Sequence, residues 1–397
     1  MKSIVAAAGI IAICYGAFVV TLWRARDRDI SRFVVAGGPG VDAREVPPGL
    51  TVRKELGGYD GMAFYRLALN PFTNEQKAHG IALDNPSYRQ QRIGYPLLVF
   101  IASFGNARWV PAALVIVNVI ALIAMAAIGG ALARQFGFSG LWGIVFPLYP
   151  GFVLTLSRDT SEIVACTFML AVAYALARER WIVAAILLTC ATLTRETSLV
   201  IAIALAVVYV WRRERQRRGR AGVVLQRLRH PPDPSLSVGM RAITFALPIS
   251  VYVCWQIALM AVWHRLPVAA GAPAIAFPFS EFAKFLAAAA PRRIYIQRLY
   301  FMESIYLALL VIIVVVIWRR SSAAIEWRVA WLGYLIVAAI MPHSIWIEDF
   351  GFLRIFGDLC LVSAVLIVAS TVTARWLALI ASAVLWFHLA QHVIELH

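Results

Sequence analysis

The chain has 397 residues, of which 61% are hydrophobic and only 15% are charged, and its mean hydropathy is +0.76. Its apolar residues form long uncharged runs rather than periodic stripes, which excludes an ordinary soluble globular protein. The net charge of +16 would suggest a nucleic-acid partner in a soluble chain, but here the basic residues lie between the apolar runs. We therefore predict one all-α transmembrane domain, residues 1–397, with the lipid bilayer and no nucleic acid as partner.

The apolar runs between charged residues are candidate membrane helices, since about 20 apolar residues cross a hydrocarbon core of about 30 Å. No small-residue cleavage site closes the first run, so we expect a retained helix rather than a cleaved signal peptide. The predicted spans are eleven: Ser3–Trp23, Trp109–Ala133, Phe136–Ser157, Ile163–Ala177, Trp181–Thr194, Thr197–Trp211, Ala242–Trp263, Phe301–Trp318, Val329–Ile347, Phe356–Ala374 and Trp376–Ala390. One long helix through Arg375 is the alternative to the last hairpin, so the expected range is roughly 10 to 12 spans.

The basic residues also predict which side of the membrane each loop faces. With a cytoplasmic N-terminus, the connections on that side carry 17 basic residues, nine of them arginines in the segment 212–241. The other side carries 8 once the long loop 24–108 is left out, because long loops do not count in the positive-inside rule. We therefore expect loops 24–108 and 264–300 to face the periplasm or exterior. Segment 212–241 is then a cytoplasmic topology anchor, with a regulatory or partner site as the alternative.

Loop 24–108 contains a polar stretch rich in turn formers, Gly57–Pro96. Irregular backbone cannot lie in lipid, because its N–H and C=O groups would stay unpaired there. We expect this stretch at a membrane face or in a wet cavity, where it forms the floor of an active site. Pro96–Phe104 is too short to cross the membrane, and Phe277–Ala290 is amphipathic, so both are predicted to be interfacial helices.

Charged residues are predicted to meet at the outer ends of the spans. Burying an ionisable group in a membrane costs roughly 2.5 to 3.5 kcal/mol, so such residues are functional hypotheses. The fifth and sixth spans reach only about 21 to 23 Å at 1.5 Å per residue. The turn Arg195–Glu196 should therefore lie below the lipid surface, in a water-filled or protein-walled pocket. The same face receives seven further residues: Arg158, Asp159, Glu162, Glu348, Asp349, Arg354 and Asp358. His343, next to Pro342, is a separate candidate.

The residue types on this face suit a lipid-linked phosphate. Arg89 and Arg92 precede the interfacial helix, and their planar guanidinium groups fit phosphate oxygens. Asp60 lies in the loop above them, where a carboxylate could act as general base toward an incoming hydroxyl. Aromatic faces for a sugar ring or lipid chain would come from three tyrosines: Tyr59, Tyr65 and Tyr88.

Each candidate has a structural alternative. Asp60 could cap the helix that starts at Met62, and Asp84 in Asp-Asn-Pro could be a turn residue. Arg89 and Arg92 could anchor lipid headgroups, and His343 could be a hydrogen-bonded interfacial residue. Ion pairs that only hold the bundle together are the alternative for two sets: Arg195 and Glu196, as a mutual or a cross-helix pair, and Arg354 with Asp358.

The sequence indicates no cofactor. The five cysteines all fall in apolar runs without disulfide or zinc spacing, and neither HExxH nor an EF-hand motif occurs. The lack of a Gly-rich phosphate loop argues against a nucleotide-driven enzyme. We expect no metal site, although the carboxylates are compatible with a divalent ion.

The predicted topology resembles that of the GT-C superfamily of integral-membrane glycosyltransferases: a cytoplasmic N-terminus, one span, a long outer loop with an acidic residue, and then many spans. Four segments are similar to a bacterial family of cell-surface glycopolymer formation proteins, over roughly Met1–Trp211: GGYDGMAFYRLALNPF, LDNPSYRQQRIGYPLL, LYPGFVLTLSRDTSE and LTRETSL. The resemblance implies a GT-C-type bundle in a bacterial inner (plasma) membrane, a polyprenyl-phosphate-linked sugar donor, an inverting single displacement, and a base in the first loop that maps to Asp60. We expect this loop to lack the paired Asp-x-Asp or Glu-x-Asp of the superfamily's commonest pattern, which leaves Asp60 alone as the motif match.

We therefore expect a glycosyltransferase that moves a monosaccharide from this donor to a cell-envelope glycan or glycolipid acceptor on the outer face. Asp60 would take the acceptor proton, and the leaving phosphate would be held by Arg89 and Arg92 with Arg195 or Arg354. Sugar and acceptor contacts, or orientation of the arginines, are expected from Tyr59, Tyr65, Asp84, Tyr88, Arg158, Asp159, Glu162, Glu196 and His343. The alternatives are a flippase or transporter of a lipid-linked glycan, and a glycan polymerase or ligase. Because the charges cluster on one side and no internal repeat is seen, an enzyme is favoured over a transporter.

Overall fold

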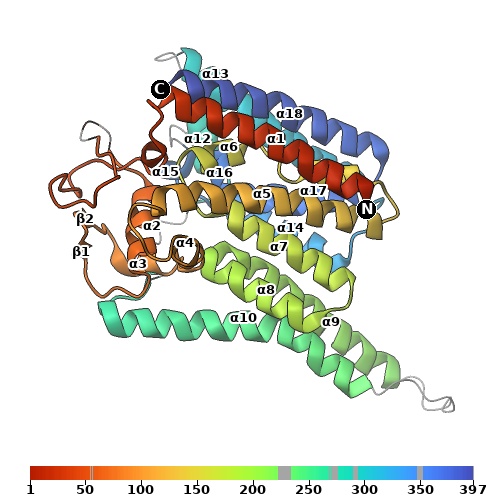
Figure 1. Cartoon of the computed structure of the whole chain (residues 1–397). Coiled ribbons are helices and arrows are strands. Elements are labelled where there is room, and N and C mark those ends of the chain that lie inside the picture. The colour runs from red at the N-terminus through yellow and green to blue at the C-terminus, as the bar shows by residue number, and fades with distance from the viewer. Residues whose placement is uncertain are drawn as a thin grey trace.

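The computed structural model is mostly helical and describes residues 1–53, 55, 57–221, 234–267, 269, 276–288, 294–346 and 352–396. Its long helices run side by side, with the two chain termini at opposite ends of the bundle (Figure 1). The end near the C-terminus carries the segment between the first two long helices, with its short helices and small sheet. This segment is the predicted loop 24–108, which is therefore folded rather than extended.

The elements in the first half of the chain are α1 (Lys2–Ala25), η1 (Ile30–Phe33), α2 (Asp60–Leu69), β1 (Lys77–Ala78), β2 (Ile81–Ala82), α3 (Pro86–Gln90), α4 (Gly94–Ser103), α5 (Val110–Gln135), η2 (Gly140–Val145), α6 (Gly151–Ser157), α7 (Glu162–Ala177), α8 (Trp181–Thr194) and η3 (Glu196–Ser198). Those in the second half are α9 (Leu199–Ala221), α10 (Pro234–Trp263), α12 (Ser280–Ala288), α13 (Ile294–Ile317), α14 (Ile325–Ala339), α15 (His343–Trp346), α16 (Phe352–Ile355), α17 (Gly357–Val368) and α18 (Val372–Glu395). β1 and β2 pair antiparallel.

Five described helices contain a segment long and apolar enough to cross a membrane: α1, α5, α10, α13 and α18. Four shorter helices are also apolar: α4, α7, α8 and α17. This fits an all-α, multi-pass membrane protein, while the predicted count of eleven spans is not confirmed.

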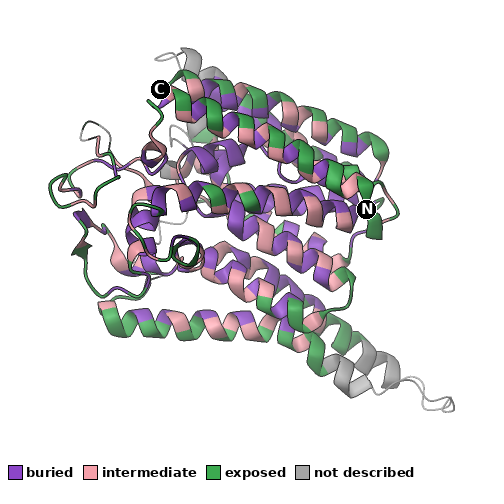
Figure 2. Ribbon diagram, in the orientation of Figure 1, coloured by how far each residue is buried: buried purple, intermediate pink, exposed green. Residues whose placement is uncertain are grey.

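Every residue of α17 is buried, as is every residue of the shorter α6. A helix that is apolar all round belongs in the interior of a bundle. Figure 2 shows the same gradient, with buried residues on the central helices and exposed ones along the outward faces of α1, α10 and α18. Residues at the start of α17 are therefore held inside the protein.

The predicted span Phe136–Ser157 is not one helix. It is divided into the 3-10 helix η2 and the short helix α6, with Pro147 and Pro150 between and beside them. Proline lacks an N–H to donate and its ring clashes with the preceding turn, so a continuous helix breaks here. Gly143 also lies so close to α5 that a Cβ would come within 2.2 Å of the Ala126 carbonyl oxygen.

The last hairpin exists, but its turn is displaced from the predicted position at Arg375. α17 ends at Val368 and α18 begins at Val372, which excludes a single long helix. The Thr371 hydroxyl accepts a hydrogen bond from the Ala374 N–H, and the Arg375 guanidinium donates to the Ser370 carbonyl at 2.9 Å. Arg375 therefore satisfies the backbone of the turn from inside α18.

Other boundaries also differ from the prediction. The predicted loop 212–241 is partly helical, because α9 continues to Ala221 and α10 already begins at Pro234. Of the loop 264–300, only part lies within the described residues, and α12 falls inside the predicted surface helix Phe277–Ala290. The short helix predicted at Pro96–Phe104 is present as α4, which starts two residues earlier.

Candidate functional site

Asp60 is the first residue of α2, and its carboxylate joins two arginines from distant parts of the chain. One oxygen lies 2.5 Å from Arg89 Nη1 and the other 2.9 Å from Arg354 Nη1. The helix is capped at Tyr59 without any side-chain hydrogen bond, so the interpretation of Asp60 as a helix cap is wrong. Its negative charge in the first helical turn is still favourable toward the helix dipole. The side chain is 18% exposed, which leaves it accessible from one side.

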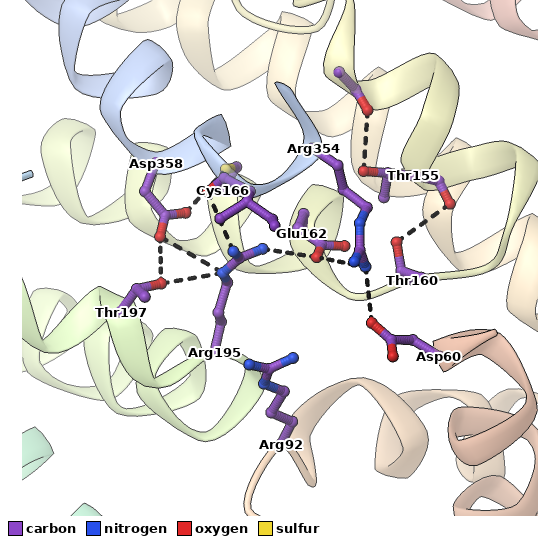
Figure 3. Close-up of polar contacts among 12 residues, drawn as sticks. Asp60, Arg92, Thr155, Thr160, Glu162, Cys166, Arg195, Thr197, Arg354 and Asp358 are labelled. Atoms are coloured by element: carbon purple, nitrogen blue, oxygen red, sulfur yellow. Dashed lines mark hydrogen bonds and ion pairs between the residues drawn. The ribbon is translucent and has the colours of Figure 1, made fainter. Parts of the chain in front are cut away.

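Arg354 begins a chain of buried charges that runs into the bundle (Figure 3). Arg354 Nη1 lies 3.1 Å from Glu162 Oε1, which in turn lies 2.8 Å from Arg195 Nη1. Arg195 Nε lies 3.7 Å from Asp358. The order is Asp60, Arg354, Glu162, Arg195 and Asp358, and the four inner side chains are each no more than 6% exposed. The structure thus brings together residues from α2, α7, α16, α17 and the turn before η3.

The predicted pairing of Arg354 with Asp358 is wrong. The two residues are four apart, but Phe356 separates α16 from α17, so they do not share the face of one helix. Asp358 instead accepts a hydrogen bond from the Thr197 hydroxyl and lies 3.6 Å from Cys166 Sγ.

Of the two alternatives for Arg195 and Glu196, the mutual pair is not formed, whereas cross-helix ion pairs are present, because Arg195 pairs with Glu162 and Glu196 pairs with Arg92. Arg195 has an extended backbone, which turns its side chain away from that of its neighbour. Glu196 forms a two-pronged ion pair with Arg92, at 2.9 Å from Nε and 2.6 Å from Nη2. Arg92 Nη2 also donates to the Tyr88 hydroxyl at 2.8 Å, and the guanidinium lies 4.9 Å from the Tyr88 ring centroid.

Asp84 holds Arg89 in the same two-pronged way. Its oxygens lie 2.8 Å from Arg89 Nε and 2.9 Å from Nη2, while Nη1 of the same arginine reaches Asp60. The alternative of Asp84 as a turn residue holds in part, because one of its carboxylate oxygens accepts a hydrogen bond from the Asn85 N–H. Asp84 also contacts Arg89, and its side chain is 67% exposed, so it lies at the outer edge of the site.

Tyr59 stacks between two guanidinium groups. The Arg158 carbon Cζ lies 4.3 Å and that of Arg354 5.0 Å from the ring centroid. Cation–π contacts of this kind favour a fixed arginine position. The ring of Tyr59 therefore orients the arginines of the site.

Two further predicted residues lie apart from these contacts, and Glu348 and Asp349 lie outside the described residues. Tyr65 is fully buried in the apolar core, and its hydroxyl has no hydrogen-bond partner among the described residues. Asp159 is also fully buried, and within the described part of the chain neither of its carboxylate oxygens has a hydrogen-bond partner. Burial raises its pKa well above the usual range, although Arg26 acts in the opposite direction. His343 begins α15, and its side chain lies outside the described residues.

The neighbouring charges of the cluster set the pKa of Asp60. Burial alone would raise the pKa of Asp60, but Arg354 and Arg89 together outweigh it and hold that pKa well below its usual range. The arginines of the cluster are Arg89, Arg92, Arg195 and Arg354, and the carboxylates that face them are Asp60, Asp84, Glu162, Glu196 and Asp358. Because each arginine here has a carboxylate partner, an anionic ligand must displace a carboxylate to bind.

Two glycines allow the segments of the site to come together. A Cβ at Gly61 would lie 2.4 Å from the Arg158 carbonyl oxygen, so the start of α2 packs directly on the turn after α6. A Cβ at Gly94 would lie 2.3 Å from Thr194 Oγ1, so α4 packs on the end of α8 beside Arg195. These close approaches fix the positions of Asp60 and of the Arg195 turn relative to the bundle.

Replacing Gly61 by alanine is expected to destabilise the protein by about 1 to 3 kcal/mol, because the added methyl group overpacks the contact with the Arg158 carbonyl. Thermal unfolding of the purified protein in detergent would measure the change. Gly57→Ala is the matched control, since nothing lies within 4 Å of a Cβ at that glycine of the same loop. Equal stability of the two variants would contradict the packing argument.

The Arg92–Glu196 pair predicts an acid-dependent loss of stability. Burial acts to raise the pKa of Glu196, but Arg92 lowers it from 4.5 to about 2. A carboxyl group whose pKa is lower in the folded state stabilises the fold above pH 4.5 and loses that contribution as the pH falls toward 2. Glu196→Gln should therefore be less stable than the wild type at pH 6, with the gap narrowing toward pH 3. If the unfolding temperatures of the wild type and Glu196→Gln changed in parallel with pH, the ionised Arg92–Glu196 pair would contribute nothing to stability.

Sequence analysis missed the contacts that hold α3 against α10. Gln91 Oε1 lies 3.2 Å from both the Tyr252 hydroxyl and Gln256 Nε2, and Gln90 Oε1 accepts a hydrogen bond from Trp263 Nε1 at 2.6 Å. The available signal was Tyr252 and Gln256, which are four apart in an apolar run and so share one helix face. These bonds fix α3, which carries Arg89.

The expectation that the first loop lacks an Asp-x-Asp pair is wrong, because Asp27 and Asp29 form one at its start. Asp27 pairs with Arg32, while Asp29 accepts hydrogen bonds from Ser31 and Thr51. Among the described residues, no group of three or more His, Cys, Asp or Glu side chains could hold a metal ion. The two aspartates therefore have local contacts around η1 in this structure.

The fold and the cluster define a class: an all-α membrane protein with an arginine–carboxylate site at one end of its bundle. Comparison of the chain with protein-family models, with curated proteins and with solved structures found no match. The argument for a function therefore depends on the residues and the geometry of the site.

Proposed function

We propose that the protein is a GT-C-type glycosyltransferase that moves a monosaccharide from a polyprenyl phosphate to a cell-envelope glycan or glycolipid acceptor. The observation that carries the proposal is the position of Asp60, whose carboxylate bridges Arg89 and Arg354 at one end of a membrane bundle. A carboxylate beside two guanidinium groups provides both a proton acceptor and a phosphate site within a few ångströms.

The arginines would bind the donor phosphate. Arg89 and Arg354 are only 21% and 6% exposed, so water screens their charges weakly. As the glycosidic C–O bond breaks, negative charge grows on the leaving phosphate, and cations already in position stabilise the transition state more than the ground state. Arg92 and Arg195 lie behind them, held by Glu196 and Glu162.

Asp60 would be the general base of an inverting displacement. While it is paired with two arginines its pKa is too low for efficient proton transfer, since a base works best with a pKa near the operating pH. A donor phosphate that takes over Arg89 and Arg354 would leave Asp60 unpaired and raise its pKa. The base is then active only when the donor is bound, which limits wasteful reaction with water.

The distribution of basic residues supports the orientation that the proposal needs. A cytoplasmic N-terminus in a bacterial inner membrane, as the positive-inside rule predicts, puts the first loop and Asp60 on the periplasmic or exterior side. Figure 1 places the N-terminus and this loop at opposite ends of the bundle, which is the arrangement that such an orientation requires.

The test is glycosyl transfer by the purified, full-length protein. It would be mixed with radiolabelled polyprenyl-phosphate sugar and a crude envelope-glycan acceptor, and the labelled product measured. Transfer of label to the glycan supports the enzyme. Movement of the intact labelled lipid across liposomes without bond cleavage would instead establish a flippase, and transfer only from a diphosphate-linked glycan would establish a polymerase or ligase.

A further inference from the structure

A second polar cavity lies at the other end of the bundle from the Asp60 cluster. α9 starts just after the Arg195–Glu196 turn, and Arg212 follows Leu199 by 13 residues, a distance of about 20 Å along a helix. Around Arg212 the helices enclose a cavity of about 300 Å³. Its lining comes from α5, α7, α8, α9, α10, α14 and α17, whose ends gather on this side of the bundle (Figure 1).

Two arginines and two glutamates line this cavity. Arg212 Nη1 lies 2.8 Å from Glu326 Oε1, so these two charges neutralise each other. The Arg241 guanidinium lies 5.1 Å from the Trp181 ring centroid, and among the described residues no carboxylate forms an ion pair with it. Glu179, in the turn between α7 and α8, is the remaining charged group. Arg241 is therefore a cation held in place by an aromatic ring and available to an anion.

The remaining lining is apolar. The aliphatic wall consists of Leu132, Ala173, Leu176, Ala177, Leu205 and Val365. Trp181 and Trp327 also line the cavity, and tryptophan is common where an apolar environment meets water. The volume is at the lower end of the range of small-molecule sites, about 300 to 1,000 Å³. A ligand that fits has an apolar body and an anionic head.

We propose that this cavity binds one anionic phospholipid, with its phosphate on Arg241 and part of one acyl chain along the aliphatic wall. Basic pockets between membrane helices are suited to anionic headgroups. The nine arginines between Arg212 and Arg241 would raise the local concentration of such lipids, and the cavity would select one of them. This site is independent of the proposed glycosyl transfer, because it shares no residue with the Asp60 cluster.

The test uses the full-length protein in a neutral detergent and counts bound lipid by native mass spectrometry. Phosphatidylglycerol is expected to give a saturable one-to-one adduct, and phosphatidylcholine is not. Arg241→Gln should weaken this binding at least tenfold. Ala177→Phe should weaken it as well, because the exposed alanine lines the cavity and the larger ring fills it without changing any charge.

Arg213→Gln is the matched control, since this exposed arginine neighbours Arg212 but does not line the cavity. Equal loss in Arg213→Gln and Arg241→Gln, or no loss in either, would overturn the proposal, because non-specific attraction to a basic surface behaves in that way. Inorganic phosphate is the second probe. If it alone raised the unfolding temperature of the wild type as much as the lipid does, and had no effect on Arg241→Gln, the ligand would be a free phosphate and the lipid assignment would fail.

Discussion

Asp60→Asn is expected to lower the turnover of glycosyl transfer by about 100-fold to 10,000-fold, the usual contribution of a general base. The amide keeps the size of the side chain but cannot accept the proton of the acceptor hydroxyl. It also removes one of the two carboxylates that pair with each of Arg89 and Arg354, so the donor phosphate no longer has to displace Asp60. Donor binding should therefore be unchanged or tighter while turnover falls, a split that loss of folding would not produce.

Asp42→Asn provides the matched control for this variant. Asp42 lies in the same loop, and its carboxylate accepts hydrogen bonds from the backbone N–H and the guanidinium of Arg44, whose side chain faces solvent. Turnover and donor affinity would be measured for both variants with the labelled polyprenyl-phosphate sugar. Undiminished turnover in Asp60→Asn would remove Asp60 from the role of base, and weaker donor binding would show that it serves to position the arginines.

Glu162→Ala is expected to destabilise the protein by about 3 to 5 kcal/mol. Glu162 is 3% exposed and lies between Arg354 and Arg195, so its removal leaves two buried cations facing each other, each with one of its two carboxylate partners lost. Removing one partner of a buried ion pair is among the most costly changes in a folded protein. The unfolding free energy in a detergent–denaturant mixture, or the shift in unfolding temperature, would measure the effect.

Two comparisons would separate charge from packing at Glu162. Glu45→Gln removes one partner of the exposed pair with Lys77 and should leave stability nearly unchanged, because water screens exposed pairs. Combining Glu162→Ala with Arg195→Met should recover part of the loss, since an apolar replacement of a buried pair is often neutral. No recovery in the double variant would mean that packing around Glu162, rather than its charge, maintains stability.

The fold was predictable where the signal is local. The long apolar runs predicted helices at α1, α5, α10, α13 and α18, because a membrane helix needs only a continuous apolar stretch. The failures occurred where proline or capping ended a run, as in the division of 136–157 into η2 and α6. The turn before α18 was displaced for the same reason, since Thr371 caps the helix and Arg375 lies within it.

The sequence by itself determined which residues could form a site. The polar stretch around Asp60, the Arg89 and Arg92 pair and the Arg195–Glu196 turn were all recognisable, because charged residues next to membrane spans are costly and therefore rare. It did not determine the partners. Only the tertiary structure joined Asp60 to Arg354 and Arg92 to Glu196, across 294 and 104 residues of chain.

The physical reason is that an ion pair depends on where helices pack, and the sequence shows only how each helix forms. Sequence spacing favoured the local pairs Arg195 with Glu196 and Arg354 with Asp358, yet the helix break at Phe356 and the extended backbone at Arg195 redirected these side chains. Gly61 and Gly94 then allowed α2 and α4 to approach the bundle closely enough for the long-range pairs to form. Local chemistry thus selected the residues, and the packing of the helices decided which of them meet.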